Sequence, residues 1–260
     1  MKLLAILPAL FFVFPNPSGA QQSSAAPVVQ RDPQAVALLQ SSIHAMGGTA
    51  PTDSTATGTV TIVAGSETSN GTIRILTRGT NETSEQISVP EWTTTVIFSS
   101  GLAAQSVNST TTTLSAQRAA TCQSVLLPLP FLAAALANSD ESIPYVGLEN
   151  SGQQSLQHIR IQNTFASQTV LQQFADFAVF DVWLDATTSL PQRISYVRRD
   201  GGGAAPRIPV AASFTGYQTV SGVAYPSGIQ VSFNGTPWAT ITISNVVFDT
   251  GLTDSSFLLQ

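Results

Sequence analysis

The sequence predicts a mainly β fold, in which a curved antiparallel sheet of ten or eleven strands encloses an apolar interior and two or three helices accompany it. Three observations support this prediction. Apolar residues alternate with polar ones over many short segments, as in strands that bury one face. One segment near the N-terminus has helical spacing instead, and one apolar segment in the middle of the chain loses the alternation.

The first twenty residues have the order of a secretory signal peptide. Lys2 is followed by an apolar stretch over 3–14, and small residues lead up to Ala20, after which we expect cleavage. The stretch is about twelve residues long, whereas a spanning helix needs about 20. With no cysteine at the cleavage position for lipid attachment, we expect an unanchored periplasmic or secreted protein. Residues 21–31 are predicted to be a flexible leader, and 32–260 a single domain.

The segment RDPQAVALLQSSIHAMGG predicts a helix of about four turns. Asp32 can cap its N-terminus, Pro33 suits the first turn, and Gly47 or Gly48 ends it. The apolar side chains that form one stripe along it are Val36, Leu39, Ile43 and Met46.

From Thr55 the period changes to two, and Gly/Ser/Asn-rich linkers separate the alternating segments. The apolar residues of these early strands are Val60, Ile62, Ile73, Ile75, Ile87, Val89, Val96 and Phe98. Residues 115–140 lose this alternation and carry the apolar run Val125–Leu136, where Pro130 can open a helix. This run is either a core helix or a helix that lies over something hydrophobic.

Alternation returns after residue 155 and continues almost to the C-terminus. The later strands are marked by Ile159 and Ile161, Val182 and Leu184, Ile194 and Tyr196, Phe214 and Tyr217, Ile229 to Phe233, and Ala239 to Ile243. Asn234-Gly235 between the last two predicts a tight hairpin.

The composition excludes several kinds of partner, whereas no motif identifies a function. The formal net charge is −5, and it becomes −6 if Lys2, the only lysine, leaves with the signal. Nothing basic is clustered, so neither a nucleic acid nor an anionic membrane is an expected partner. No stable membrane insertion is expected, because no other segment is long and apolar enough to span a membrane. Cys122 is the only cysteine, so no internal disulfide can form. It is interpreted as a buried free thiol, with a reactive or intermolecular thiol as the alternative.

The sequence contains no recognisable catalytic or metal-binding motif. His44 and His158 lie far apart with no cysteine or carboxylate at ligand spacing, so no metal and no cofactor are expected. Asp140-Glu141 and the pair Asp181 and Asp185 are the carboxylate pairs, interpreted as loop and turn residues rather than a catalytic dyad. An aromatic group in the middle of the chain is either core or the lining of an apolar cavity: Phe131, Phe174, Phe177, Phe180 and Trp183.

The order of these segments resembles the LolA/LolB-like outer-membrane lipoprotein-sorting superfamily, which includes RseB-type regulators and mycobacterial lipid carriers. The matching stretches are ALLQSSIHAMGG, VWLDATTSLPQRISY, GYQTVSGVAYPSGIQV and ISNVVFDTGLTDSSFLL, which span about residues 32–260. The positions that carry the resemblance are Asp185, Leu190, Pro191, Arg193, Gly222, Val223, Pro226 and Phe257.

The resemblance implies an unclosed antiparallel β-barrel of about eleven strands, with helices covering its concave side and a hydrophobic cavity for acyl chains. It also implies a functional arginine in the early strands, the region of Arg74 and Arg78.

The leading hypothesis is therefore a non-enzymatic periplasmic carrier or binding protein for a lipoprotein or another acyl-chain ligand, with residues 125–137 as a lid. The residues expected to line its cavity are Ile62, Ile75, Phe98, Phe131, Leu132 and Trp183. Two alternatives stay open. One is an RseB-like envelope sensor that binds a protein partner, and the other is a secreted enzyme that uses a carboxylate pair.

Overall fold

The structure is a computed structural model that describes residues 28–99, 101–121, 124–152, 154–199 and 206–258. Cys122, most of the signal and leader segments, and the glycine-rich loop after Arg199 lie outside the described residues. The helices are α1 (Pro33–Ala45), α2 (Ala116–Thr121) and α3 (Pro128–Ala137), with 3₁₀ turns η1 (Gln172–Phe177) and η2 (Asp254–Phe257). The strands are β1 (Asp53–Ala64), β2 (Glu67–Arg78), β3 (Glu82–Val89), β4 (Trp92–Ser99), β5 (Leu102–Val107), β6 (Thr110–Thr113), β7 (Glu141–Ser142), β8 (Tyr145–Ser151), β9 (Gln154–Asn163), β10 (Val179–Asp185), β11 (Pro191–Arg198), β12 (Ile208–Val220), β13 (Val223–Phe233) and β14 (Thr236–Phe248).

Within the described residues the fourteen strands form one antiparallel sheet that does not close on itself. Its order is β6-β5-β4-β3-β2-β1-β14-β13-β12-β11-β10-β9-β7, and β8 also pairs with β9. The predicted fold class is thereby confirmed, but the expected count of about eleven strands is too low. The strands that the alternation missed are β5 to β8, of which β6 is a run of four exposed threonines.

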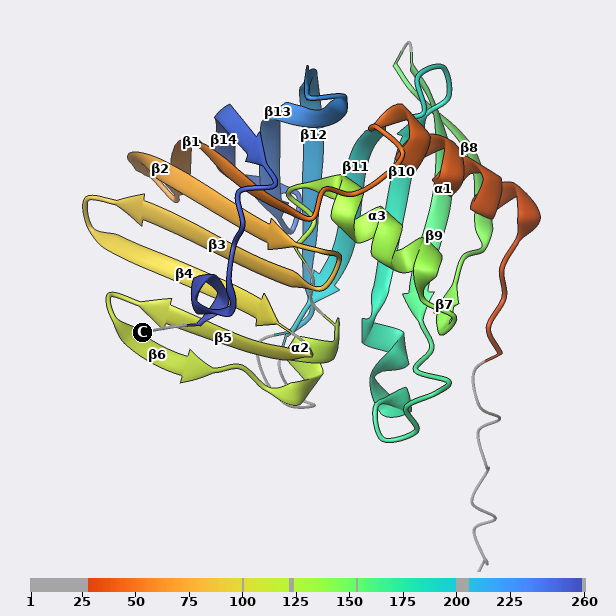
Figure 1. The fold of residues 1–260 in the computed structure, drawn as a ribbon, viewed down its shortest axis with the longest axis horizontal. Helices are drawn as coiled ribbons and strands as arrows, with labels where there is room; N and C mark the ends of the chain where they lie inside the picture. Colours follow the sequence, from red (N-terminus) through yellow and green to blue (C-terminus); the bar gives the residue numbers. More distant parts are fainter. Residues whose placement is uncertain (1–27, 100, 122–123, 153, 200–205, 259–260) are drawn as a thin grey trace, which may run out of the picture.

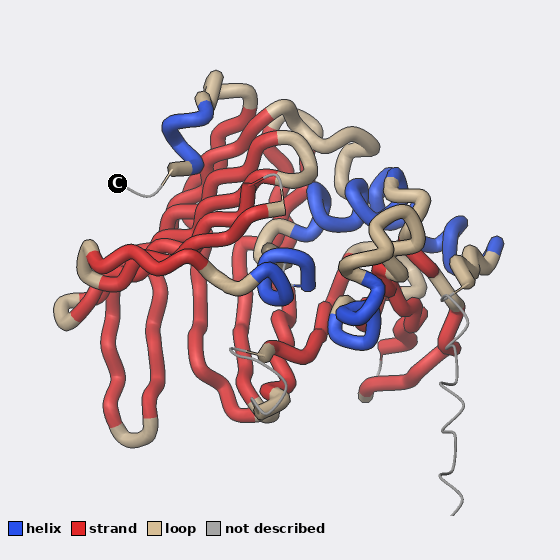
Figure 2. Tube along the Cα trace, turned by 90° about the horizontal axis from the view of Figure 1, so that it is seen from below, coloured by secondary structure: helices blue, strands red, loops and turns tan. Residues whose placement is uncertain are grey.

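The sheet bends into an open half-barrel, and α1 and α3 lie across β9 to β11 on its inner side (Figures 1 and 2). Alternate residues of the strands face inward and form the main core with these two helices. Ile75 of β2, Ile159 of β9 and Ile194 of β11 are fully buried there. The ring centroids of Phe131 in α3 and Phe180 in β10 lie 4.9 Å apart. The inner face is therefore apolar, and the helices cover part of it.

Helix α1 begins and ends where the sequence predicts. The Asp32 carboxylate accepts hydrogen bonds from the backbone N–H groups of Gln34 (2.8 Å) and Ala35 (3.2 Å), and Pro33 occupies the first helical position. Gly47 and Gly48 follow with φ angles of 118° and 84°, which suit glycine at a helix C-terminus. The buried stripe contains Leu39, Ile43 and Met46 as expected, but Ala35 is buried on it while Val36 is only half-buried.

The segment before α1 is bound to the rest of the molecule. Arg31 forms a parallel bridge with Ile143, and its guanidinium donates to the carbonyls of Leu136 (2.8 Å) and Asn138 (3.0 Å) at the C-terminal end of α3. A cation at this end of a helix is favourable, because the last carbonyls lack intrahelical partners. Arg31 thus holds α3 beside α1. The division of the chain into 1–20, 21–31 and 32–260 stays a prediction.

The hairpin between β13 and β14 follows the sequence prediction. Asn234 and Gly235 both have positive φ angles, 50° and 77°, as a two-residue type I′ turn requires. Strand β14 then pairs with β1, so the last strand of the chain joins the first near the middle of the sheet.

The C-terminal segment after β14 is held by the buried carboxylate of Asp53. Its oxygens accept hydrogen bonds from the N–H groups of Thr250 (2.7 Å), Gly251 (2.8 Å) and Leu252 (3.0 Å) and from the Thr250 hydroxyl (2.8 Å). Burial alone would raise the pKa of Asp53, but these hydrogen bonds outweigh it and hold the pKa below its ordinary value.

We expect Asp53→Asn to lower the free energy of unfolding by more than about 2 kcal/mol, because an amide cannot accept all of these buried hydrogen bonds. The stability that Asp53 contributes should be present above about pH 4 and be lost as the pH falls through its lowered pKa. Urea denaturation at pH 7 and pH 3 measures both effects. Asp254→Asn is the matched control, since the Asp254 side chain is 91% exposed and its ion pair should contribute less than about 1 kcal/mol. Equal effects of the two substitutions would contradict this role of Asp53.

Candidate functional site

The uncovered part of the inner face is hollow and forms a cavity with two compartments. The first, called here the sheet compartment, has a volume of about 460 Å³ and lies between β3 to β5 on one side and β11 to β14 on the other. Its wall is mostly apolar and includes three acidic or basic side chains. Its lining residues include Ile87, Trp92, Val96, Phe98, Val125, Leu126, Val210, Val231, Phe233, Trp238 and Ile241, with Glu85, Arg118 and Arg198 as the acidic or basic ones.

The second compartment, called here the helix compartment, has a volume of about 650 Å³ and lies between α2, α3 and the nearby ends of β2 to β5. Phe98 and Ser124 line both compartments, so the two adjoin. Small side chains make the room along the two helices: Ala116, Ala119, Ala120, Ala134, Ala135 and Ala137. Each compartment lies within the size range of small-molecule sites.

Helix α3 can line a cavity because its two faces differ in size. Leu129 and Leu132 pack into the main core, while Ala134, Ala135 and Ala137 present only methyl groups to the helix compartment. Pro128 occupies the start of the helix, where its missing N–H group costs nothing. The helix starts two residues before Pro130, the predicted start.

The structure divides the six predicted cavity residues into three groups. Phe98 lines both compartments, and Phe131 lines the helix compartment. Ile62, Ile75 and Leu132 face the same interior but are buried in the packed core. Contact of any of these residues with a ligand stays a prediction.

Trp183 is the exception, because it lies on the outer face of the sheet. Its indole N–H donates to Glu149 (2.9 Å), its ring stacks on His158 with centroids 4.3 Å apart, and the Arg193 guanidinium lies 3.6 Å from its ring centroid. The residues of β10 that face the core are its alternate neighbours Phe180, Val182 and Leu184. The prediction that Trp183 lines the cavity is wrong, because strand alternation turns it the other way.

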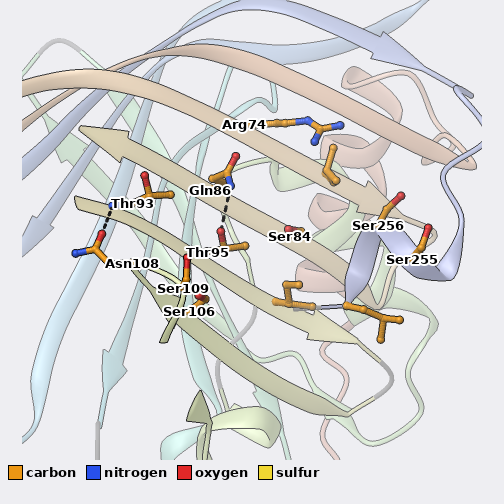
Figure 3. A pocket seen from close by; sticks show the side chains of 13 residues that line it. Arg74, Ser84, Gln86, Thr93, Thr95, Ser106, Asn108, Ser109, Ser255 and Ser256 are labelled. Atoms are coloured by element: carbon orange, nitrogen blue, oxygen red, sulfur yellow. Dashed lines mark hydrogen bonds between the residues drawn. The ribbon is translucent and has the colours of Figure 1, made fainter. Parts of the chain in front are cut away.

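Another hollow, of about 700 Å³, lies on the outer face of β2 to β5 beside the C-terminal turn η2 (Figure 3). Figure 3 shows Arg74, Gln86 and Thr95 on neighbouring strands, with Ser255 and Ser256 on the turn beside them. Hydroxyl and amide groups dominate this wall, which makes it a poor site for an acyl chain. We therefore take the inner cavity, whose sheet compartment has a mostly apolar wall, as the candidate site.

Neither arginine of the early strands faces the inner cavity. Arg74 is exposed at the outer hollow. Arg78 donates to Glu82 (2.5 Å) and Asp254 (2.6 Å) and lies over the Phe257 ring, 5.1 Å from its centroid. Arg78 therefore fixes the C-terminal turn. The arginines in the region where the resemblance implies a functional arginine thus lie on the outer face of the sheet.

The carboxylates Asp181 and Asp185 do not form a pair. Four residues along a strand separate their Cα atoms by about 13 Å. Asp181 accepts from His158 and Arg160, each at 2.9 Å, whereas Asp185 accepts from the backbone of Thr187 and Thr188 in the following turn. The hydrogen bonds from Thr188, the strongest influence, hold the pKa of Asp185 below its ordinary value.

Two glutamates lie at the cavity wall. Glu85 was not singled out from the sequence, and Glu141, which was interpreted with Asp140 as a loop residue, is buried in β7. Burial raises the pKa of Glu85 in the sheet compartment and raises that of Glu141 in the helix compartment to about 7. The signal for Glu85 was present in the sequence, since it occupies an inward position of an alternating strand between Thr83 and Ile87. Glu141 lacks such a signal, because β7 has only two residues.

No helix among the described residues is long and apolar enough to cross a membrane.

Several solved structures share this fold. A LolA superfamily protein from Nitrosomonas europaea superposes with a TM-score of 0.57 at 12% identity, over 86% of this chain and 97% of that one. A domain from Vibrio parahaemolyticus named for outer membrane lipoprotein sorting gives 0.55 at 14% identity, over 85% and 95% of the two chains. A DUF1329 family protein from Desulfovibrio piger gives 0.55 at 14% identity, over 87% and 98%.

At these identities the comparisons concern the fold alone. The chain has the open-barrel fold of the LolA superfamily, and the resemblance inferred from its sequence is confirmed at that level. No protein-family model and no curated protein sequence matches the chain.

We expect Glu141 to destabilise the protein as the pH rises. It is 5% exposed, and Oε2 has no hydrogen-bond partner among the described residues. Burial, the strongest influence, together with Asp140 raises its pKa, while Asn138 and Arg31 lower it less. The folded state therefore binds a proton between pH 4.5 and about 7 that the unfolded state releases, so stability present below pH 4.5 is lost as the pH rises through 7.

Glu141→Gln should remove that loss, which amounts to roughly 3 kcal/mol at most. The variant should be more stable than wild type at pH 8 and about equal to it at pH 4.5 in urea denaturation. Exposed Glu67→Gln is the matched control and should follow the wild-type curve. Parallel curves for wild type and Glu141→Gln from pH 5 to 8 would show that Glu141 is not the cause.

Proposed function

We propose that this protein is a carrier or binding protein for an acyl-chain ligand, either a free lipid or the lipid part of a lipoprotein. The observation that carries the proposal is the two-compartment cavity on the inner face of the half-barrel, whose sheet compartment has a mostly apolar wall. A fold shared with a domain named for outer membrane lipoprotein sorting is consistent with it.

The energetics support a hydrocarbon ligand. Each CH₂ group moved from water into an apolar cavity contributes about 0.8 kcal/mol, so a chain of ten or more carbons provides enough free energy for binding without any polar contact. Phe98 lies where the compartments adjoin, and a chain that fills both would pass beside it. Residues 125–137, which include α3, would then act as the lid.

The proposed location is outside the cytoplasm, in the periplasm or secreted, with residues 1–20 removed as a signal peptide. The N-terminal charge, apolar stretch and small residues before the cleavage position support this. An acyl-chain carrier has a use there, because lipid chains cannot cross an aqueous compartment unprotected.

The two alternatives to a carrier are a secreted enzyme that uses a carboxylate pair and a sensor that binds an envelope protein. The pair Asp181 and Asp185 does not support the carboxylate-pair enzyme, since each of the two binds other groups. The sensor that binds an envelope protein remains a prediction, and a stable complex in a pull-down would distinguish it from a carrier.

The cavity can be tested by filling it from α3. Ala134 lines the helix compartment, whereas its neighbour Ala133 is absent from the lining of both compartments. Ala134→Phe should weaken the binding of a fluorescent fatty acid at least about tenfold, because the phenyl ring occupies space that the acyl chain needs. Ala133→Phe, the matched control, should bind as wild type does.

Native mass spectrometry of wild type purified without detergent should also show a co-purified lipid. An unliganded mass together with no binding of fluorescent fatty acids would refute the proposed function.

A further inference from the structure

One carboxyl group in the sheet compartment has no evident structural purpose. Glu85 lies on the inner face of β3, and its register neighbours are Ile75 of β2 and Val96 of β4, both apolar. Its side chain lines the compartment. A carboxyl group in such surroundings costs free energy unless something compensates it.

Hydrogen bonds within the protein compensate only part of the cost of burying the Glu85 carboxyl group. The Ser124 hydroxyl donates a hydrogen bond to one oxygen of Glu85. The other oxygen has no hydrogen-bond partner among the described residues. Burial raises the pKa of this carboxyl group, and the Ser124 hydrogen bond is the only influence that lowers it. The compartment therefore favours an uncharged carboxyl group, which carries an O–H donor as well as acceptors.

The ionisable side chains around the compartment bear on which polar group of a ligand can pair with Glu85. The titratable side chains that line it besides Glu85 are Arg118 from α2 and Arg198 and Tyr196 from β11. An ammonium head has no lone pair that could accept a hydrogen bond from an uncharged Glu85. A ligand with a hydrogen-bond acceptor, by contrast, can accept a hydrogen bond from it.

Resting on the proposed function, we propose that Glu85 recognises the acyl carbonyl group of the ligand. The carboxyl O–H of Glu85 donates a hydrogen bond to the carbonyl oxygen, and the hydrocarbon chain extends past Phe98 toward the helix compartment. Glu85 is then a specificity-determining residue, which selects chains that end in an ester, amide or carboxylic acid over amines and plain hydrocarbons.

The test compares ligands with one chain length and different heads. Dissociation constants are measured by displacement of a fluorescent fatty acid for decanoyl glycerol, decanoic acid and decylamine, and pyrene serves as a fluorescent hydrocarbon. Wild type should bind decanoyl glycerol or decanoic acid at least about tenfold more tightly than decylamine. Tighter binding of either carbonyl ligand supports the proposal, and the ratio of the two distinguishes an ester-linked chain from a free acid.

Three variants isolate Glu85. Glu85→Leu should weaken decanoyl glycerol about tenfold, the usual effect of one lost hydrogen bond, and leave pyrene unchanged. Glu85→Gln keeps a donor and should bind decanoyl glycerol within about threefold of wild type. Glu91→Gln, in the exposed turn between β3 and β4, is the matched control and should change nothing.

The pH dependence provides a readout that does not depend on whether Glu85→Leu folds. Wild type should bind decanoyl glycerol more weakly as the pH rises and Glu85 loses its proton, while Glu85→Gln should bind it equally at each pH. Equal binding of decanoyl glycerol by wild type and Glu85→Leu, a preference for decylamine, or identical pH profiles of wild type and Glu85→Gln would overturn the role of Glu85 and leave the carrier function standing. Failure of wild type to bind any of the four ligands would overturn both.

Discussion

The apolar inner face of the sheet is the constraint on which the rest of the structure depends. A closed barrel would bury this face against itself, but the sheet ends at β6 on one side and at β7 and β8 on the other, so other parts of the chain must cover it. Helices α1 and α3 cover the region of β9 to β11, where Phe131 meets Phe180. Opposite β3 to β5 the helices present small side chains. The part of the inner face that they leave uncovered lines the cavity.

The cover stays in place because polar groups fix it at its ends. Arg31 binds the last carbonyls of α3, and Asp32 caps α1 directly after it, so two neighbouring residues position both helices. At the other end of the chain Asp53 and Arg78 hold the C-terminal turn against the outer face, away from the cavity. These polar contacts thus lie outside the sheet compartment, whose wall remains mostly apolar.

The sequence predicted those parts of the fold that depend on local patterns. The cap and the glycines of α1, the Asn234-Gly235 turn and the alternating strands all lie as expected, because neighbouring residues determine them. Strand β6 was missed because four threonines carry no apolar alternation, and it exists only through pairing with β5.

The candidate site was harder to predict, because it depends on which face of each strand turns inward and where the helices stop. Trp183 was assigned to the cavity as an aromatic residue, although alternation with Val182 and Leu184 places it outside. Glu85 was overlooked although the same alternation places it inside. The sequence predicts that the alanine-rich segment of α3 is an apolar helix. Only the tertiary arrangement shows that Ala134, Ala135 and Ala137 line a cavity.

The central claim is that an acyl chain lies in the inner cavity, and photo-crosslinking tests it most directly. A fatty acid with a diazirine near the end of its chain would be bound to the intact protein and activated by light, and the labelled peptides would be mapped by mass spectrometry. We expect labels on β3, β4 and α3, at residues such as Phe98 and Ala134 that line the compartments. Labels confined to the outer face of the sheet, around Arg74 and Ser255, would contradict the account.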